Sequence, residues 1–188
     1  NPDVFEFKEM LISLSRKKDD MEKTIAIVKN ILSSLEKNCP QYNELKNIIA
    51  DIYFFNGKLE DSQAYSQEVL AVDPKNAQAQ FNLCRITLQK NSGLAVVGEL
   101  RRLSNENPGN AEYSYYLGLA HKARGEDILA QTAFEDALEK SPEHKNALIA
   151  LSEMYAKIGI YKKLEKYVGK YLKLNPDDEE VKSLLQRA

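Results

Sequence analysis

The chain has 188 residues, of which 43% are hydrophobic and 29% are charged, and this is enough for a folded core beneath a soluble surface. Its formal net charge of −2 provides no global basic field that would attract nucleic acid or an acidic membrane. Its apolar runs, such as residues 48–50, are far too short to span a bilayer.

The first stretch, residues 3–42, predicts a divergent helical hairpin. We expect its turn around residues 16–20, where three basic residues precede two aspartates, and its second helix from about Asp20 to Lys37. The opening tripeptide Asn-Pro-Asp occurs again at residues 175–177, where it closes a repeat. Because the chain starts at such a boundary and not with Met, we expect the natural protein to extend upstream.

A 34-residue period then runs through the rest of the chain, marked by Pro40, Pro74, Pro108, Pro142 and Pro176. A fixed period of this size is typical of proteins stacked from copies of one small unit. Aligned on the prolines, the repeats are residues 43–76, 77–110, 111–144 and 145–178.

The repeat 111–144 shows most clearly what each unit contains. Residues 113–124 have helical spacing and end at Gly125, which suits the left-handed turn that closes a helix. A second helix is expected from Asp127 to Lys140, because the residue before Pro142 is pushed out of helical geometry. Each repeat is therefore predicted to be a helix, a tight turn and a second helix.

Two further positions keep the same period. The predicted turns fall on Gly57, Asn91, Gly125 and Gly159, and asparagine is the best substitute for glycine where φ is positive. Seven residues before each turn stands a small residue: Ala50, Cys84, Gly118 or Ser152. Small side chains there let the two helices of a hairpin approach closely. The last stretch, residues 179–188, predicts one more helix that covers the final hairpin with Val181, Leu184 and Leu185.

The repeat resembles the tetratricopeptide repeat (TPR), on the evidence of Leu117-Gly118, Ala130, Phe134, Ala137 and Pro142 in the unit 111–144. The signature Trp is absent, and Ser62, Val96 and Leu164 replace the middle Ala of the other units. The resemblance implies an all-α protein, an α-solenoid of stacked antiparallel helix hairpins in a right-handed superhelix with a C-terminal capping helix. In this family the first helix of each hairpin lines a concave groove.

Carried onto this sequence, the groove positions form the candidate partner-binding site. Its residues are Asn47, Asp51, Phe55, Phe81, Asn82, Arg85, Leu88, Glu112, Tyr115, Leu119, Ile149 and Glu153. Phe81, Tyr115 and Ile149 hold the same position in successive repeats, so we expect an exposed apolar strip. The alternative is that these three side chains pack between helices as core.

One specialised form of this family does not fit. Some cochaperones with this repeat grip a C-terminal carboxylate with lysine, arginine and asparagine side chains on three hairpins. Asn82 matches that pattern, but Glu112 and Tyr116 stand where the Lys and Arg should be. An acidic group there would repel a carboxylate.

No catalytic, metal or cofactor site is predicted. His121 is expected to be a partly buried hairpin residue and His144 to lie in a surface turn, with no further ligand at metal-binding spacing. Cys84 belongs to the helix-packing seam and Cys39 to a turn, so neither suggests an activated thiol or a disulfide framework.

We therefore expect a non-catalytic adaptor that binds a protein or peptide segment, and neither nucleic acid nor a small-molecule substrate. The alternatives are a self-association module, which would make the chain a homo-oligomer, and a regulatory region of a longer protein, for example in bacterial envelope or secretion assembly. The two cysteines favour a reducing compartment such as the cytoplasm. A periplasmic or membrane-tethered full-length protein stays open.

Overall fold

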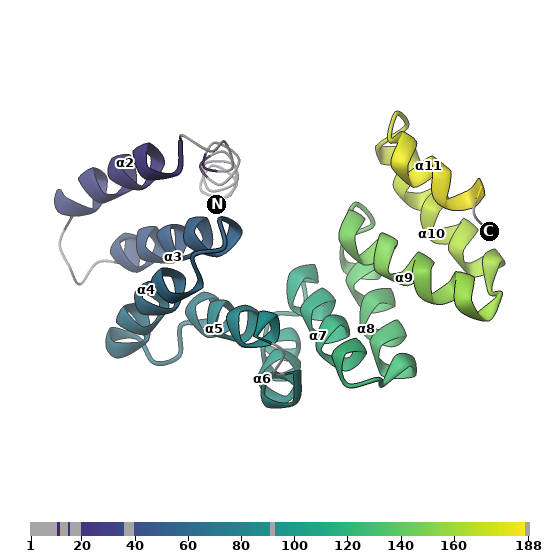
Figure 1. The fold of residues 1–188 in the computed structure, drawn as a ribbon, viewed down its shortest axis with the longest axis horizontal. Helices are drawn as coiled ribbons and strands as arrows, with labels where there is room; N and C mark the ends of the chain where they lie inside the picture. The colour runs from purple at the N-terminus through teal and green to yellow at the C-terminus, as the bar shows by residue number, and fades with distance from the viewer. Residues whose placement is uncertain (1–10, 12–14, 16–19, 36–39, 91–92, 187–188) are drawn as a thin grey trace. The chain divides into compact units, whose positions relative to one another are not determined.

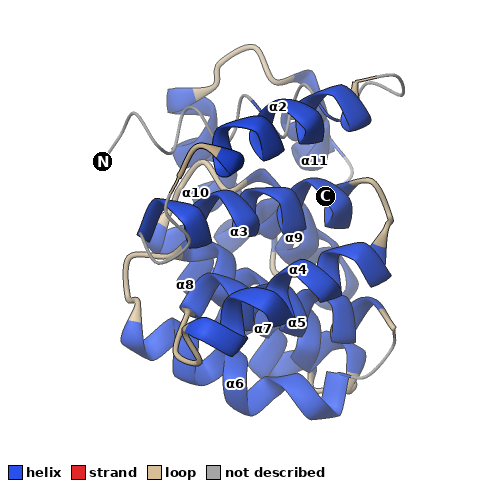
Figure 2. Ribbon diagram, turned by 90° about the vertical axis from the view of Figure 1, so that its left-hand side faces the viewer, coloured by secondary structure: helices blue, strands red, loops and turns tan. Residues whose placement is uncertain are grey.

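The computed structural model describes residues 11, 15, 20–35, 40–90 and 93–186. Every regular element in this part of the chain is a helix, as Figure 2 shows, and the predicted all-α class is confirmed. In chain order the helices are α2 (Met21–Ser33), α3 (Pro40–Phe55), α4 (Leu59–Val72), α5 (Ala77–Gln89), α6 (Gly93–Glu106), α7 (Ala111–Ala123), α8 (Asp127–Lys140), α9 (Lys145–Ile158), α10 (Tyr161–Leu174) and α11 (Glu179–Gln186).

The chain divides into two compact units, residues 1–86 and 87–188, with the boundary inside α5. In the first unit α2 packs on α3, and α3 packs on α4 (Figure 1). In the second unit each helix from α6 to α11 packs on the next, and α11 also contacts α9. Each unit is described by itself below. That the whole chain forms a single array of hairpins stays a prediction.

The 34-residue period appears directly in the helix boundaries. The second helices of the hairpins, α4, α6, α8 and α10, begin at residues 59, 93, 127 and 161. The turns inside the hairpins contain Gly57, Gly125 and Gly159 at φ of 74°, 72° and 71°, a conformation that side chains with a Cβ atom disfavour. The predicted helix 127–140 is confirmed residue for residue. Asn91, expected at the equivalent turn, lies outside the described residues, as does Cys39.

Helix ends differ from the sequence expectations where local capping decides them. Helix α3 begins at Pro40, before the repeat that starts at residue 43, because proline suits the first turn of a helix, where its missing N–H is not needed. Helix α7 begins at Ala111 and not at residue 113, since the Asn110 side chain accepts a hydrogen bond of 3.0 Å from the Glu112 N–H.

Helix α2 also ends earlier than predicted, at Ser33. The hydroxyls of Ser33 and Ser34 donate to carbonyl oxygens of the last turn, at 2.7 Å each, and the Ser34 N–H donates there as well. These local bonds satisfy carbonyl groups that a longer helix would have used.

Close approach of the helices depends on the small residues of the period. Ala50, Cys84, Gly118 and Ser152 are all buried. Gly118 faces the ring of Phe134 so closely that an added Cβ atom would lie 2.5 Å from the ring carbon Cε1. Helices α7 and α8 can therefore pack at this distance only with glycine at residue 118.

Each unit has its own apolar core. In residues 1–86 the core joins α2 to α3, with Val28, Ile49 and Ile52 fully buried. In residues 87–188 it runs from α8 to α11, and α11 covers its end with the buried Val181 and the half-buried Leu184, as predicted. The side chain of Leu185 lies outside the described part of the chain. No helix in the described ranges is long and apolar enough to cross a membrane.

Candidate functional site

The predicted groove residues of the first unit come together around one buried ion pair. The Arg85 guanidinium on α5 bonds through Nη2 to Oδ1 of Asp51 on α3, and the two side chains are only 4% and 1% exposed. The same Nη2 atom donates to Oδ1 of Asn82 at 2.5 Å. A buried pair of this kind makes its charges unavailable to a ligand and fastens one hairpin to the next.

Aromatic rings surround the guanidinium of Arg85. Its carbon Cζ lies 4.4 Å from the ring centroid of Phe54, 4.9 Å from that of Phe81 and 5.4 Å from that of Phe55. Stacking on ring faces stabilises a cation that burial has stripped of water. Phe55 is 41% exposed, so the cluster reaches the surface there, whereas Phe81 is buried at 3% exposure.

Two predicted polar residues support the same junction. Asn47 donates from Nδ2 to Oδ1 of Asn76 at 3.0 Å, and that oxygen also accepts from the Ala79 N–H at the start of α5. Asn82 is fully buried, and its Oδ1 accepts from Gln78 at 3.0 Å as well as from Arg85. Asn47 therefore links α3 to the turn before α5, whereas Asn82 accepts from Arg85 and Gln78, which both bond to Asp51 of α3.

These contacts correct two exposure expectations. Phe81 does not contribute to an exposed strip, because it packs beneath Arg85, and so the alternative of core packing holds at this position. Arg85 does not present its charge to solvent, since Asp51 neutralises it inside the protein. Asp51 and Arg85 stand at the same position of successive repeats, so opposite charges 34 residues apart were the signal that could have revealed the pair.

In the second unit the predicted residues form a different kind of surface. We call it the α7–α9 face, made of the predicted Glu112, Tyr115, Leu119, Ile149 and Glu153 together with Lys122, which was not predicted as a site residue. Tyr115, Leu119 and Ile149 are half-buried, and Tyr115 and Leu119 pack against the apolar core with one side. Each keeps part of its surface accessible, and whether the three form an exposed apolar strip stays a prediction.

Polar contacts join the two helices of the α7–α9 face at both ends. At one end Oε1 of Glu112 lies 3.2 Å from Nε2 of His144, and the Tyr115 ring lies 4.8 Å from the His144 ring. At the other end Nζ of Lys122 donates to Oε2 of Glu153 at 3.1 Å. Burial, with the nearby Tyr116 and acidic groups, raises the pKa of Tyr115 to about 12, so the phenol is neutral at physiological pH.

His144 lies in the turn after Pro142, as predicted, but its side chain does not face solvent. It precedes α9, its Nδ1 accepts from the Ala147 N–H at 3.2 Å, and its side chain is only 7% exposed. A capping bond to the helix start therefore draws the ring inward. His121 is more buried than expected, at 3% exposure, and its Nδ1 lies 2.6 Å from Oε2 of Glu126.

The remaining predicted residue, Leu88, is half-buried on α5.

A polar network that the sequence did not predict joins α6, α7 and α8. Lys140 donates to Ser104 at 3.0 Å and to Ser114 at 2.7 Å, and Ser114 donates to Asp136 at 2.6 Å. Its members share no repeat position, so the period carries no signal for it. Across the described ranges, no three His, Cys, Asp or Glu side chains are grouped as metal ligands.

Comparison with curated proteins finds matches to small parts of two longer chains. The sequence is 28% identical over 142 residues to the Protein CTR9 homolog of Arabidopsis thaliana, and 21% identical over 176 residues to the Tetratricopeptide repeat protein 21 homolog of Caenorhabditis elegans. These matches cover 71% and 91% of this chain, but the chain spans only 13% of the length of each relative. No family model matches the sequence.

Solved structures share the fold at low sequence identity. TTC0263, a thermophilic TPR protein of Thermus thermophilus, superposes with a TM-score of 0.72 at 18% identity, covering 98% of this chain and 96% of that one. MamA superposes with a TM-score of 0.61 at 22% identity, covering 88% and 94%. The predicted α-solenoid of stacked hairpins is thereby confirmed, and a fold of this type serves in general as a scaffold for protein interactions.

Proposed function

Because the chain shares the fold of tetratricopeptide repeat proteins, we propose that it is a non-catalytic adaptor that binds a peptide segment of a partner protein on the α7–α9 face. The observation that supports this most directly is the row of half-buried apolar side chains Tyr115, Leu119 and Ile149 beside the exposed Glu112 and Glu153. Apolar surface framed by polar groups is typical of an interaction site.

The packing beneath these side chains suits them to binding. The Tyr115 ring lies 5.8 Å from the buried ring of Phe134 and 4.8 Å from the His144 ring, so its position is fixed before a partner arrives. A rigid surface lowers the ordering cost that a flexible peptide pays on binding. The buried Asp51–Arg85 junction adds no ligand contact in this proposal; it holds α5 against α3.

The test is a pull-down from lysate of the source cells with the native chain and a Leu119→Ser, Ile149→Ser variant. Leu174→Ser is the matched control, because Leu174 is 55% exposed on α10 and lies away from the face. Circular dichroism first checks that helix content is kept. A protein that is retained by the native chain and the control but lost from the variant identifies the partner.

The partner fragment is then titrated against each purified variant by calorimetry. We expect Leu119→Ser and Ile149→Ser each to weaken binding by about 1–2 kcal/mol if the side chains are hot spots. If the native chain, the variants of the α7–α9 face and the Leu174→Ser control bind the same partners with equal affinity, the α7–α9 face is not the binding surface.

A further inference from the structure

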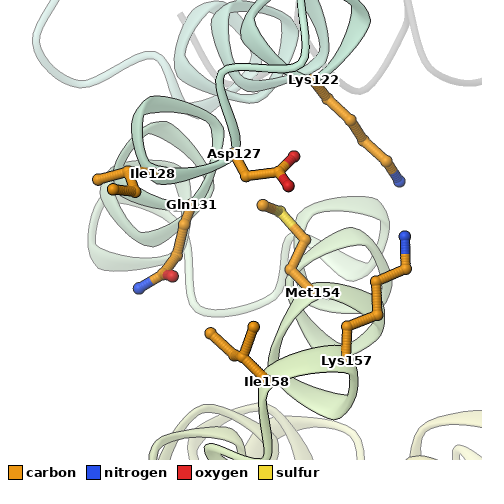
Figure 3. A pocket seen from close by; sticks show the side chains of 7 residues that line it. All are labelled: Lys122, Asp127, Ile128, Gln131, Met154, Lys157 and Ile158. Carbon is orange, nitrogen blue, oxygen red and sulfur yellow. The ribbon is translucent and has the colours of Figure 1, made fainter.

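A pocket of about 140 Å³ opens beside the internal turns of two successive hairpins in the second unit. It is lined by Lys122 of α7, by Asp127, Ile128 and Gln131 of α8, and by Met154, Lys157 and Ile158 of α9. Figure 3 shows Met154 between the helices, with Lys122 and Lys157 on one side of it in this view and Ile128 on the other. The pocket thus has an apolar floor and a cationic edge.

Two isoleucines of this pocket are far more exposed than their size would favour. Ile128 is 82% exposed at the first turn of α8, and Ile158 is 57% exposed at the last turn of α9. Neither fills the core, which Met154 reaches instead at 8% exposure. Scattered exposed apolar residues are ordinary, but these two line one pocket together with Met154.

The other repeats provide an internal comparison. The positions equivalent to Ile158 hold Asn56, Lys90 and Arg124, and those equivalent to Ile128 hold Glu60, Leu94 and Lys162. The repeat therefore does not need an apolar residue at the end of the first helix. At the start of the second helix, two of the other three repeats have a polar residue. The combination of both isoleucines at one junction is a feature of this pocket and not of the solenoid.

The chemistry of the lining restricts what the pocket can hold. A cavity of roughly 150 Å³ accommodates a benzene molecule, so one large apolar side chain fits this volume. Lys157 is exposed and makes no ion pair within the described ranges, while Lys122 is engaged by Glu153. Asp127 also lines the pocket and disfavours a second acid beside it. A carboxylate of the occupant would therefore be directed to the lysine edge.

We infer that this pocket, hereafter the α8–α9 pocket, docks a segment of a partner protein that carries one large apolar side chain next to an acidic residue. The apolar side chain contacts Ile128, Met154 and Ile158, and the acidic residue pairs with Lys157. The site uses different side chains from the proposed peptide-binding face, apart from Lys122, and does not depend on that proposal.

The experiment is selection of short random peptides displayed on phage against the full chain, followed by fluorescence anisotropy of the enriched peptides. We expect enriched peptides to share a large apolar residue flanked by Asp or Glu. Ile128→Ser combined with Ile158→Ser should weaken their binding about tenfold or more. Lys157→Glu should weaken it through charge alone, and it serves as the second variant because the side chain is exposed.

Two control variants separate this site from the rest of the unit. Leu174→Ser removes an equally exposed apolar side chain elsewhere, and Ile149→Ser alters the α7–α9 face; both should leave the binding unchanged. The proposal is overturned if no such peptide is enriched, if basic peptides are enriched instead, or if Ile149→Ser reduces binding as much as the pocket variants do. It is also overturned if sedimentation shows a dimer that Ile128→Ser abolishes, since the pocket would then dock a second copy of the chain.

Discussion

The buried pair Asp51–Arg85 gives the sharpest prediction about the stability of the first unit. The perturbation is Asp51→Ala, which leaves the guanidinium of Arg85 buried without its carboxylate. Removing one member of a buried ion pair typically costs about 3–5 kcal/mol, because a charge that is out of water has lost its partner. Both side chains are less than 5% exposed, so solvent cannot replace the missing carboxylate without opening the α3–α5 junction.

The double variant Asp51→Leu, Arg85→Met isolates the pair from its surroundings. Replacing both charges by apolar side chains of similar volume is often neutral or even stabilising. Here the double variant also loses the stacking on Phe54 and Phe81, worth about 0.5–2 kcal/mol. We therefore expect the double variant to be clearly more stable than Asp51→Ala. With the single variants Asp51→Leu and Arg85→Met completing the cycle, we expect a coupling energy of about 2 kcal/mol or more.

The assay combines urea unfolding, followed by circular dichroism, with hydrogen exchange measured on peptides from each helix. Exchange is needed because repeat arrays can unfold in parts, so a single transition does not locate the loss. Protection should fall in α3 and α5 and remain in α8 and α9. Glu68→Ala is the matched control: the Glu68 side chain is 56% exposed in its pair with Lys46, so its loss should cost at most about 1 kcal/mol.

The reasoning is refuted if Asp51→Ala costs no more than Glu68→Ala, or if the Asp51 and Arg85 variants are additive in the cycle. Either result would mean that the two charges are solvated and do not fasten α3 to α5. Arg85 would then be available to a partner, as its place among the candidate partner-binding residues predicted.

Further predictions concern the second unit. Gly118→Ala should lower the free energy of unfolding by about 1–3 kcal/mol despite the better helix propensity of alanine, since its Cβ would meet the buried ring of Phe134. Denaturant unfolding measures this loss, and an unchanged midpoint would contradict it. The Lys145 ammonium, with further hydrogen bonds, holds the pKa of Asp178 at about 2. This carboxylate therefore stabilises the fold fully at a pH above its unfolded pKa near 3.8, and the contribution is lost as the pH falls through about 2. The difference in Tm between the native chain and Asp178→Asn should therefore shrink between about pH 4 and pH 2, and a constant difference would refute the pairing. Tyrosine ionisation is followed by absorbance in the native chain and in Tyr115→Phe. The step that the native chain shows and the variant lacks should lie near pH 12, not near pH 10.

The candidate site shows how far the position of a residue within a repeat can predict whether its side chain is exposed. Arg85, Leu119 and Glu153 hold equivalent positions, yet the first is buried in an ion pair, the second is half-buried and the third is exposed. The difference arises from the neighbours that each meets, because only Arg85 has an aspartate at the equivalent position of the preceding repeat. Whether any of the predicted groove residues binds a partner stays a prediction.

The sequence by itself determined the helix hairpins and their period, because the determinants are local. Proline before a helix, glycine at positive φ and a small residue at each crossing act within a few residues of where they stand, and the helix 127–140 follows from them directly. Capping side chains such as Asn110 then shift individual ends by one or two residues. These are short-range hydrogen bonds that a repeat alignment averages out.

Only the tertiary structure decided which side chains are available to a partner. Exposure depends on what the next hairpin places opposite a residue, and that is set by packing between segments distant in sequence. Packing removed Phe81 and Arg85 from the surface, drew His144 inward and brought Ile128 of one hairpin beside Ile158 of the next. The period can locate each of these positions, but it cannot say what lies across from them.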